Sequence, residues 1–61
     1  RAIRNIQAIL IKLGYEPGEP DGVVGQQTTA AIKAFQKEAG LTADGSIDET
    51  LIRALLARKD G

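Results

Sequence analysis

The segment Ile3–Tyr15, with the sequence IRNIQAILIKLGY, contains an amphipathic stripe followed by a helix stop. Its apolar residues recur every three or four positions, as they do along one face of an α-helix: Ile3, Ile6, Leu10 and Leu13. Gly14 can then adopt the left-handed conformation that ends many helices, and Tyr15 is placed to fold back on Leu10. We therefore predict a helix over residues 3–13.

Two later segments repeat this pattern. Residues 26–39 carry an apolar stripe before Gly40, and Asp48 is well suited to cap a third helix whose first turn contains Glu49. The expected buried residues of these two helices are Ala31, Ile32, Phe35, Ala39, Leu51, Ile52, Leu55 and Leu56. Three amphipathic helices can close one core, so we predict an all-α fold, a three-helix bundle with two Asp-Gly turn loops.

The loops, residues 16–25 and 42–47, each contain an Asp-Gly pair: Asp21-Gly22 and Asp44-Gly45. An aspartate side chain can accept a hydrogen bond from the backbone two residues on, while the glycine takes the positive φ of a turn. Turn chemistry alone accounts for both pairs. We therefore favour a structural role for these aspartates over a ligand-binding one.

Three polar residues lie within or beside the apolar stripes: Gln7, Thr28 and Gln36. An unpaired buried polar group costs about 1–3 kcal/mol, so such residues usually satisfy nearby backbone groups. We predict that the two glutamines brace the loops. The hydroxyl of Thr28 is expected to bond backbone groups in the first turn of its helix.

Composition narrows the possible functions. The 61 residues include no cysteine and no histidine, which removes disulfides, thiolate metal sites and the usual general base. The eight basic and eight acidic residues are scattered, so a polyanion is not an expected partner. No apolar run reaches the roughly 18 residues of a membrane span. We expect residues 1–61 to form one domain taken from a longer protein, since the chain starts at Arg1.

The order and spacing of many residues resemble one bacterial family. These residues are Gln7-Ala8-Ile9-Leu10, Leu13-Gly14-Tyr15, Asp21-Gly22, Gly25, Thr28, Ala31, Phe35-Gln36, Gly40-Leu41 and Asp44-Gly45. The ordered set closely resembles the bacterial peptidoglycan-binding domain family of three-helix repeats. The resemblance implies a non-catalytic module without cofactor or metal, which binds glycan or stem peptide in the bacterial cell envelope, periplasmic or extracellular.

The predicted ligand-binding residues lie on the first loop and the start of the second helix: Tyr15, Asp21, Gln26, Gln27 and Thr28. A helix N-terminus presents free N–H groups and a partial positive charge, which suit the hydroxyls, amides and carboxylates of peptidoglycan. The two glutamine amides add donors and acceptors, and Tyr15 could add an apolar platform. A single small site of this kind binds weakly and depends on a repetitive wall for avidity.

Two other classes are compatible with paired loop-helix units. Calcium-binding repeats need oxygen ligands at alternating positions and a late acidic ligand, and Val23 interrupts this alternation in the first loop. A three-helix protein- or DNA-interaction domain remains the alternative. The neutral net charge argues against its DNA-binding form. We expect the isolated domain to be monomeric and not inserted into a membrane.

Overall fold

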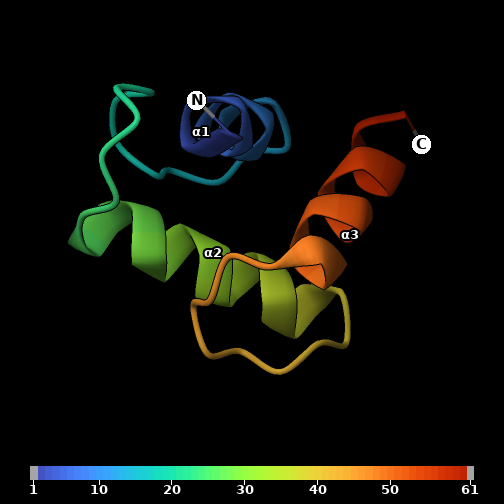
Figure 1. Cartoon of the computed structure of the whole chain (residues 1–61). Helices are drawn as coiled ribbons and strands as arrows, with labels where there is room; N and C mark the ends of the chain where they lie inside the picture. The colour runs from blue at the N-terminus through green and yellow to red at the C-terminus, as the bar shows by residue number, and fades with distance from the viewer. Residues whose placement is uncertain (1, 61) are drawn as a thin grey trace.

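The computed structural model describes residues 2–60, and this part of the chain folds into three α-helices without strands (Figure 1). They are α1 (Ala2–Lys12), α2 (Gln26–Glu38) and α3 (Glu49–Asp60). In Figure 1, α1 is seen nearly along its axis, α2 crosses below it, and α3 rises from the far end of α2. The predicted all-α class is confirmed. No helix of the described residues is long and apolar enough to cross a membrane.

The first two helices end at glycines, as their sequences predicted. Gly14 has a φ of +97°, and the N–H of Tyr15 donates to the carbonyl of Leu10 at 2.9 Å. Gly40 has a φ of +77°, and the N–H of Leu41 donates to the carbonyl of Gln36 at 2.8 Å. In each case a left-handed residue turns the chain back across the last helical turn and satisfies a carbonyl that the helix leaves free.

All three helices contribute to one small core. Its buried apolar residues are Ile6, Leu10, Ala31, Ile32, Phe35, Leu51 and Leu55. Tyr15 packs beside them, with its ring edge-on to that of Phe35 at 5.9 Å between centroids. Edge-to-face aromatic pairs add about 0.5–1.5 kcal/mol beyond the area they bury. The chain segment that leaves α1 is therefore fixed to the last turn of α2.

One predicted core residue of α3 was assigned to the wrong side. Leu56 is 45% exposed, whereas Leu51 and Leu55 are fully buried. Residues four apart lie on one helix face, but each further residue turns about 100° around the axis. The buried face of α3 includes fewer residues than its run of apolar residues suggests. Ile52 is only half-buried, and Leu56 is exposed. Ala39 at the end of α2 is also only half-buried.

The start and end of α3 are each fixed by polar contacts. Asp48 caps the helix as predicted, with its Oδ1 accepting from the N–H of Leu51 at 2.9 Å. Near the other end, the Arg58 guanidinium lies 5.6 Å from the ring centroid of Phe35 and donates to the carbonyl of Glu38 at 3.4 Å. Cations over aromatic faces are attracted by about 0.5–1 kcal/mol at exposed sites. The two contacts of Arg58 join α3 to α2.

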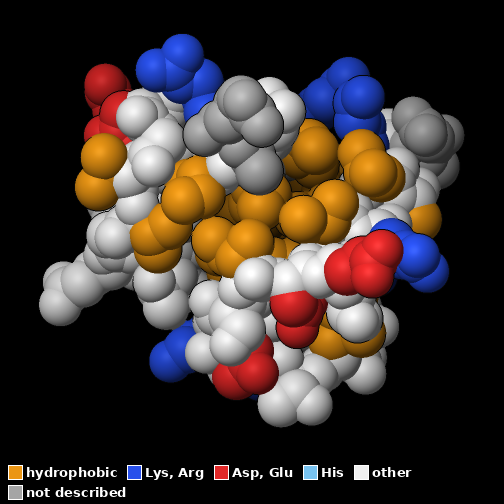
Figure 2. All heavy atoms as spheres, viewed as in Figure 1, with side chains coloured by type: hydrophobic (Ala, Val, Ile, Leu, Met, Phe, Trp, Pro, Cys, Tyr) orange, Lys and Arg blue, Asp and Glu red, His pale blue; other side chains and the backbone are white. Residues whose placement is uncertain are grey.

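Some large apolar side chains are exposed on the molecular surface. Figure 2 shows hydrophobic side chains gathered in the middle of one face, with basic and acidic side chains around them. The exposed large apolar residues are Ile11, Val23, Val24 and Leu56. A domain this small buries only about 60% of the surface of its unfolded chain. Stability therefore depends heavily on the polar contacts that fix the loops.

Candidate functional site

The first loop is fastened to α1 by the fully buried side chain of Gln7. Its Oε1 accepts from the N–H of Gly22 at 3.0 Å, and its Nε2 donates to the carbonyl of Val23 at 2.9 Å. Asp21 completes the turn, because its Oδ1 accepts from the N–H of Val23 at 2.9 Å. The prediction that Gln7 braces the loop and that Asp21 serves the turn is confirmed.

The second loop is fastened to α2 by Gln36, which is 3% exposed. Its Oε1 accepts from the N–H of Gly45 at 2.9 Å, and its Nε2 donates to the carbonyl of Ser46 at 3.3 Å and to Oδ1 of Asp44 at 3.2 Å. The N–H of Ser46 donates to the same Asp44 oxygen at 2.9 Å, and this bond lowers the pKa of Asp44. Both Asp-Gly turns are thus held by a buried glutamine of the preceding helix.

Thr28 links the two ends of the first loop. Its hydroxyl donates to the carbonyl of the buried Pro17 at 2.7 Å and accepts from Nε2 of Gln7 at 3.0 Å. The prediction that this hydroxyl bonds backbone groups in the first turn of α2 is therefore wrong. The hydroxyl joins α1, the loop and α2 in one buried network, because a single oxygen can both donate and accept.

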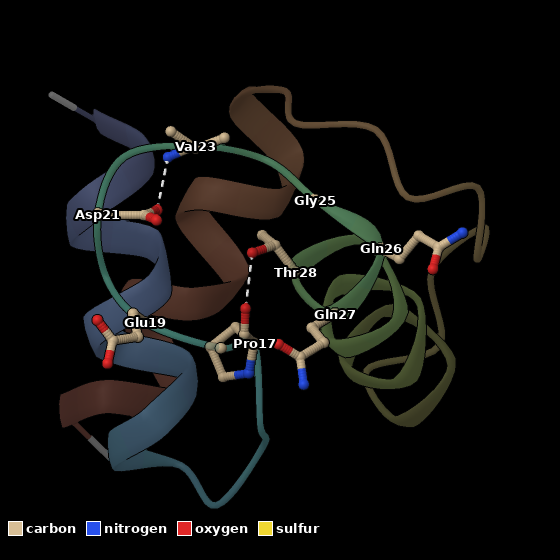
Figure 3. A pocket seen from close by; sticks show the side chains of 9 residues that line it. Pro17, Glu19, Asp21, Val23, Gly25, Gln26, Gln27 and Thr28 are labelled. Atoms are coloured by element: carbon tan, nitrogen blue, oxygen red, sulfur yellow. Dashed lines mark hydrogen bonds between the residues drawn. The ribbon is translucent and has the colours of Figure 1, made fainter.

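A surface cleft opens above this network, with a volume of about 360 Å³ (Figure 3). One wall is the loop and the other is the start of α2. The lining residues are Pro17, Gly18, Glu19, Asp21, Val23, Gly25, Gln26, Gln27 and Thr28. The volume falls within the roughly 300–1,000 Å³ of small-molecule sites.

Four of the five predicted ligand-binding residues line this cleft. Asp21, Gln26 and Gln27 are exposed, whereas Thr28 is 2% exposed and its hydroxyl is engaged below the cleft. Figure 3 shows the side chain of Gln27 directed toward Pro17 and that of Gln26 directed away from the loop. The cleft-facing group of α2 is therefore the amide of Gln27.

The fifth predicted residue, Tyr15, does not line the cleft. Its half-buried ring packs against the core and contacts Phe35, as described above. The structure thus brings together the loop turn and the start of α2, but it places the tyrosine at the other end of the loop.

The electrostatics of the cleft combine two opposed features. Glu19 and Asp21 bring carboxylates to the loop wall, and no lysine or arginine among residues 2–60 lines the cleft. At the other wall, α2 begins after Gly25, and no side chain caps it. The first N–H groups of a helix have no intrahelical partners and carry a partial positive charge. The cleft can therefore offer both donors and acceptors to a neutral polar ligand.

Five of the lining residues were not among the predicted ones: Pro17, Gly18, Glu19, Val23 and Gly25. Gly18 has a φ of +88°, and a Cβ atom there would lie 2.8 Å from Oε1 of Gln27. The amide of Gln27 thus rests against the backbone at a position that only glycine suits. The proline and glycine content of the loop was visible in the sequence, but a close approach to Gln27 has no local sequence signal.

The cleft is lined by groups that can form hydrogen bonds. Among the described residues, no group of three or more acidic side chains could hold a metal ion. The arrangement suits recognition of hydroxyls and amides.

Comparisons with curated proteins place this chain among segments of much longer proteins. It is 50% identical over 40 residues to the "Putative OxPP cycle protein OpcA" of Synechocystis, a match covering 66% of the chain and 8% of that protein. It is 40% identical over 53 residues to the N-acetylmuramoyl-L-alanine amidase CwlM of Mycobacterium tuberculosis, covering 87% of the chain and 13% of that protein.

The localization factor PodJL of Caulobacter vibrioides is 46% identical over 48 residues, a match that covers 77% of the chain and 5% of that protein. No solved structure matched the chain. The match to a family of known domains covers residues 1–55 and includes all three helices except the end of α3. By that match, the chain belongs to the family described as "Putative peptidoglycan binding domain".

Proposed function

We propose that this chain is a non-catalytic module that binds peptidoglycan and holds a longer protein on the bacterial cell wall. The observation that carries the proposal is the family match over residues 1–55, which includes every residue of the cleft. The relatives are much longer than the matched segment, and one of them is named as an amidase. Anchoring is a role that such a segment could perform in proteins of different activity.

The proposed contacts lie on the two walls of the cleft. Gln27 offers an amide, Asp21 offers a carboxylate oxygen, and the start of α2 offers N–H groups. These groups match the hydroxyls and amides of a glycan or stem peptide. Gln26 contacts the ligand only at the rim, since its side chain points away from the loop (Figure 3).

Two of the sequence-predicted site residues are assigned a supporting role. Thr28 holds Pro17 against α2, and Tyr15 fixes the start of the loop to Phe35. Both position the loop without direct contact with the ligand. Preorganisation of this kind reduces the conformational entropy lost on binding.

The open cleft predicts weak binding to a soluble fragment and stronger binding to the intact wall. A small site gives modest affinity, whereas a tethered protein meets many copies of the ligand. We place the module outside the cytoplasmic membrane, in the periplasm or at the cell exterior. We also propose that it forms one monomeric domain without a nucleic-acid partner.

An NMR titration with soluble muropeptides tests the site. Backbone shifts should cluster on residues 18–28, and the Gln27→Ala variant should reduce binding while retaining the melting temperature. The matched control is Gln26→Ala, which changes the same side-chain type beside the cleft and should have the smaller effect. Shifts confined to α3 would refute the proposed site.

A pulldown on purified sacculi tests the function itself. The wild-type domain should sediment with intact sacculi and be released by lysozyme digestion. A failure to sediment would favour the alternative, an interaction with another protein. Binding to DNA-cellulose under the same conditions would contradict both.

A further inference from the structure

We propose that the binding surface continues past Asp21 to Arg4 on α1, and that Arg4 binds a carboxylate of the peptidoglycan stem peptide. This inference rests on the proposed function. A second hollow, of about 500 Å³, lies on the other side of the Asp-Gly turn and is lined by Arg4, Asn5, Asp21 and Gly22. Asp21 lines both hollows, so the two are adjacent parts of one surface.

The position of Arg4 beside the turn is fixed by the buried network. Arg4 lies three residues before Gln7, and residues three apart share a helix face. Gln7 accepts the N–H of Gly22 at 3.0 Å, which holds the turn against that face of α1. The backbone that carries Arg4 and the backbone that carries Asp21 are thus joined by a buried side chain, although both functional groups are exposed.

The two hollows differ in charge. Among the described residues, the main cleft is lined by Glu19 and Asp21 and by no basic residue, so it disfavours a carboxylate. Of the described residues, Arg4 is the one basic residue that lines either hollow, and it shares the second hollow with Asp21. The described residues form a single ion pair, Arg53–Glu49, so no described carboxylate lies within 4.0 Å of the Arg4 guanidinium.

The chemistry of the second hollow selects among parts of peptidoglycan. An arginine can bind a carboxylate through two parallel N–H···O bonds, and the neighbouring Asn5 amide can donate to or accept from a peptide group. A glycan strand without peptides offers neutral hydroxyls and amides and does not require a cation. Arg4 therefore favours a stem peptide over bare glycan, with the remainder of the ligand in the main cleft.

The test compares two soluble muropeptides that differ only in amidation of the stem-peptide carboxylates. Wild-type protein should bind the free-carboxylate form about three- to tenfold more tightly, as expected for one partly solvated arginine–carboxylate contact. Arg4→Gln should remove this preference and leave the affinity for the amidated form unchanged. Lys37→Gln is the matched control, because it removes one exposed positive charge from α2 outside both hollows.

Two further measurements keep the outcomes distinct. The melting temperature of Arg4→Gln should equal that of wild type, since the side chain is exposed, and the wild-type preference should fall as ionic strength rises. Equal binding of both muropeptides by wild type would overturn the proposed role of Arg4, and so would an equal loss of affinity for both in Arg4→Gln. Neither result would overturn the proposed function. If wild type binds neither muropeptide and does not sediment with sacculi, both this inference and the proposed function are overturned.

Discussion

The buried network below the cleft predicts that Gln7→Leu destabilises the fold. Leucine is similar in size and keeps the apolar stripe of α1, but it removes three hydrogen bonds. Thr28 retains its bond to Pro17, so the groups left without a partner are the N–H of Gly22 and the carbonyl of Val23. Each costs about 1–3 kcal/mol when fully buried, and both are partly buried, so we expect a loss of about 2–4 kcal/mol.

This loss is large for a domain of 61 residues. The core of so small a domain rarely supplies more than about 3–5 kcal/mol, so Gln7→Leu should be partly unfolded at room temperature. A change of 1 kcal/mol shifts the melting temperature of such a domain by about 4–8 °C, which predicts a decrease of at least about 8 °C. Thermal denaturation followed by far-UV circular dichroism measures this directly.

The matched control is Gln26→Leu, which makes the same change at an exposed position. Exposed substitutions away from special features change stability by no more than about 0.5 kcal/mol. Gln36→Leu, which breaks the equivalent contacts in the second loop, should behave like Gln7→Leu. If Gln7→Leu melts like wild type but no longer sediments with sacculi, Gln7 is a ligand contact and the structural reasoning is wrong.

Three further predictions concern single contacts. Asp48→Ala removes the cap of Leu51 and should cost about 1 kcal/mol in urea unfolding, whereas Asp48→Asn should restore most of it; no loss in the alanine variant would contradict the cap. Gly18→Ala should destabilise the fold more than Gly25→Ala and should shift the NMR signals of Gln27, because a Cβ at position 18 would meet its Oε1 at 2.8 Å, whereas position 25 has open space and a negative φ. The bond from the Ser46 N–H lowers the folded-state pKa of Asp44, so its contribution to stability is present above the unfolded pKa of about 3.9 and is lost as pH falls through the lower, folded value. Asp44→Asn should therefore lose less stability than wild type between about pH 5.5 and 3, and an identical loss in both proteins would refute this linkage.

Much of the fold was predictable because its signals are local. Helical spacing identified the three stripes, and the glycines at 14 and 40 and the aspartate at 48 marked helix ends and a start. Gln7 and Gln36 could be recognised as braces because a polar residue within an apolar stripe needs partners. The exposure of Leu56 could not be recognised, since the width of a buried stripe depends on how closely the neighbouring helices approach.

The candidate site was less predictable than the fold. Asp21, Gln26, Gln27 and Thr28 were expected on one surface and do line one cleft, because all four flank the same turn and helix start. The direction of each side chain was not available from sequence, and neither was the contact between Tyr15 and Phe35, which are twenty positions apart. Arg4 carried no signal at all, since its importance depends on which face of α1 the turn covers.

The two glutamine braces also differ in the length of chain that each must close. Gln36 bonds groups 8 to 10 positions away, whereas Gln7 bonds groups 15 to 21 positions away. Longer loops lose more entropy on closure, and contacts between distant positions slow folding. The contacts of Gln36 close a shorter stretch of chain than those of Gln7, so we expect them to form earlier in folding. The loop that forms the candidate cleft would then be the later of the two loops to become ordered.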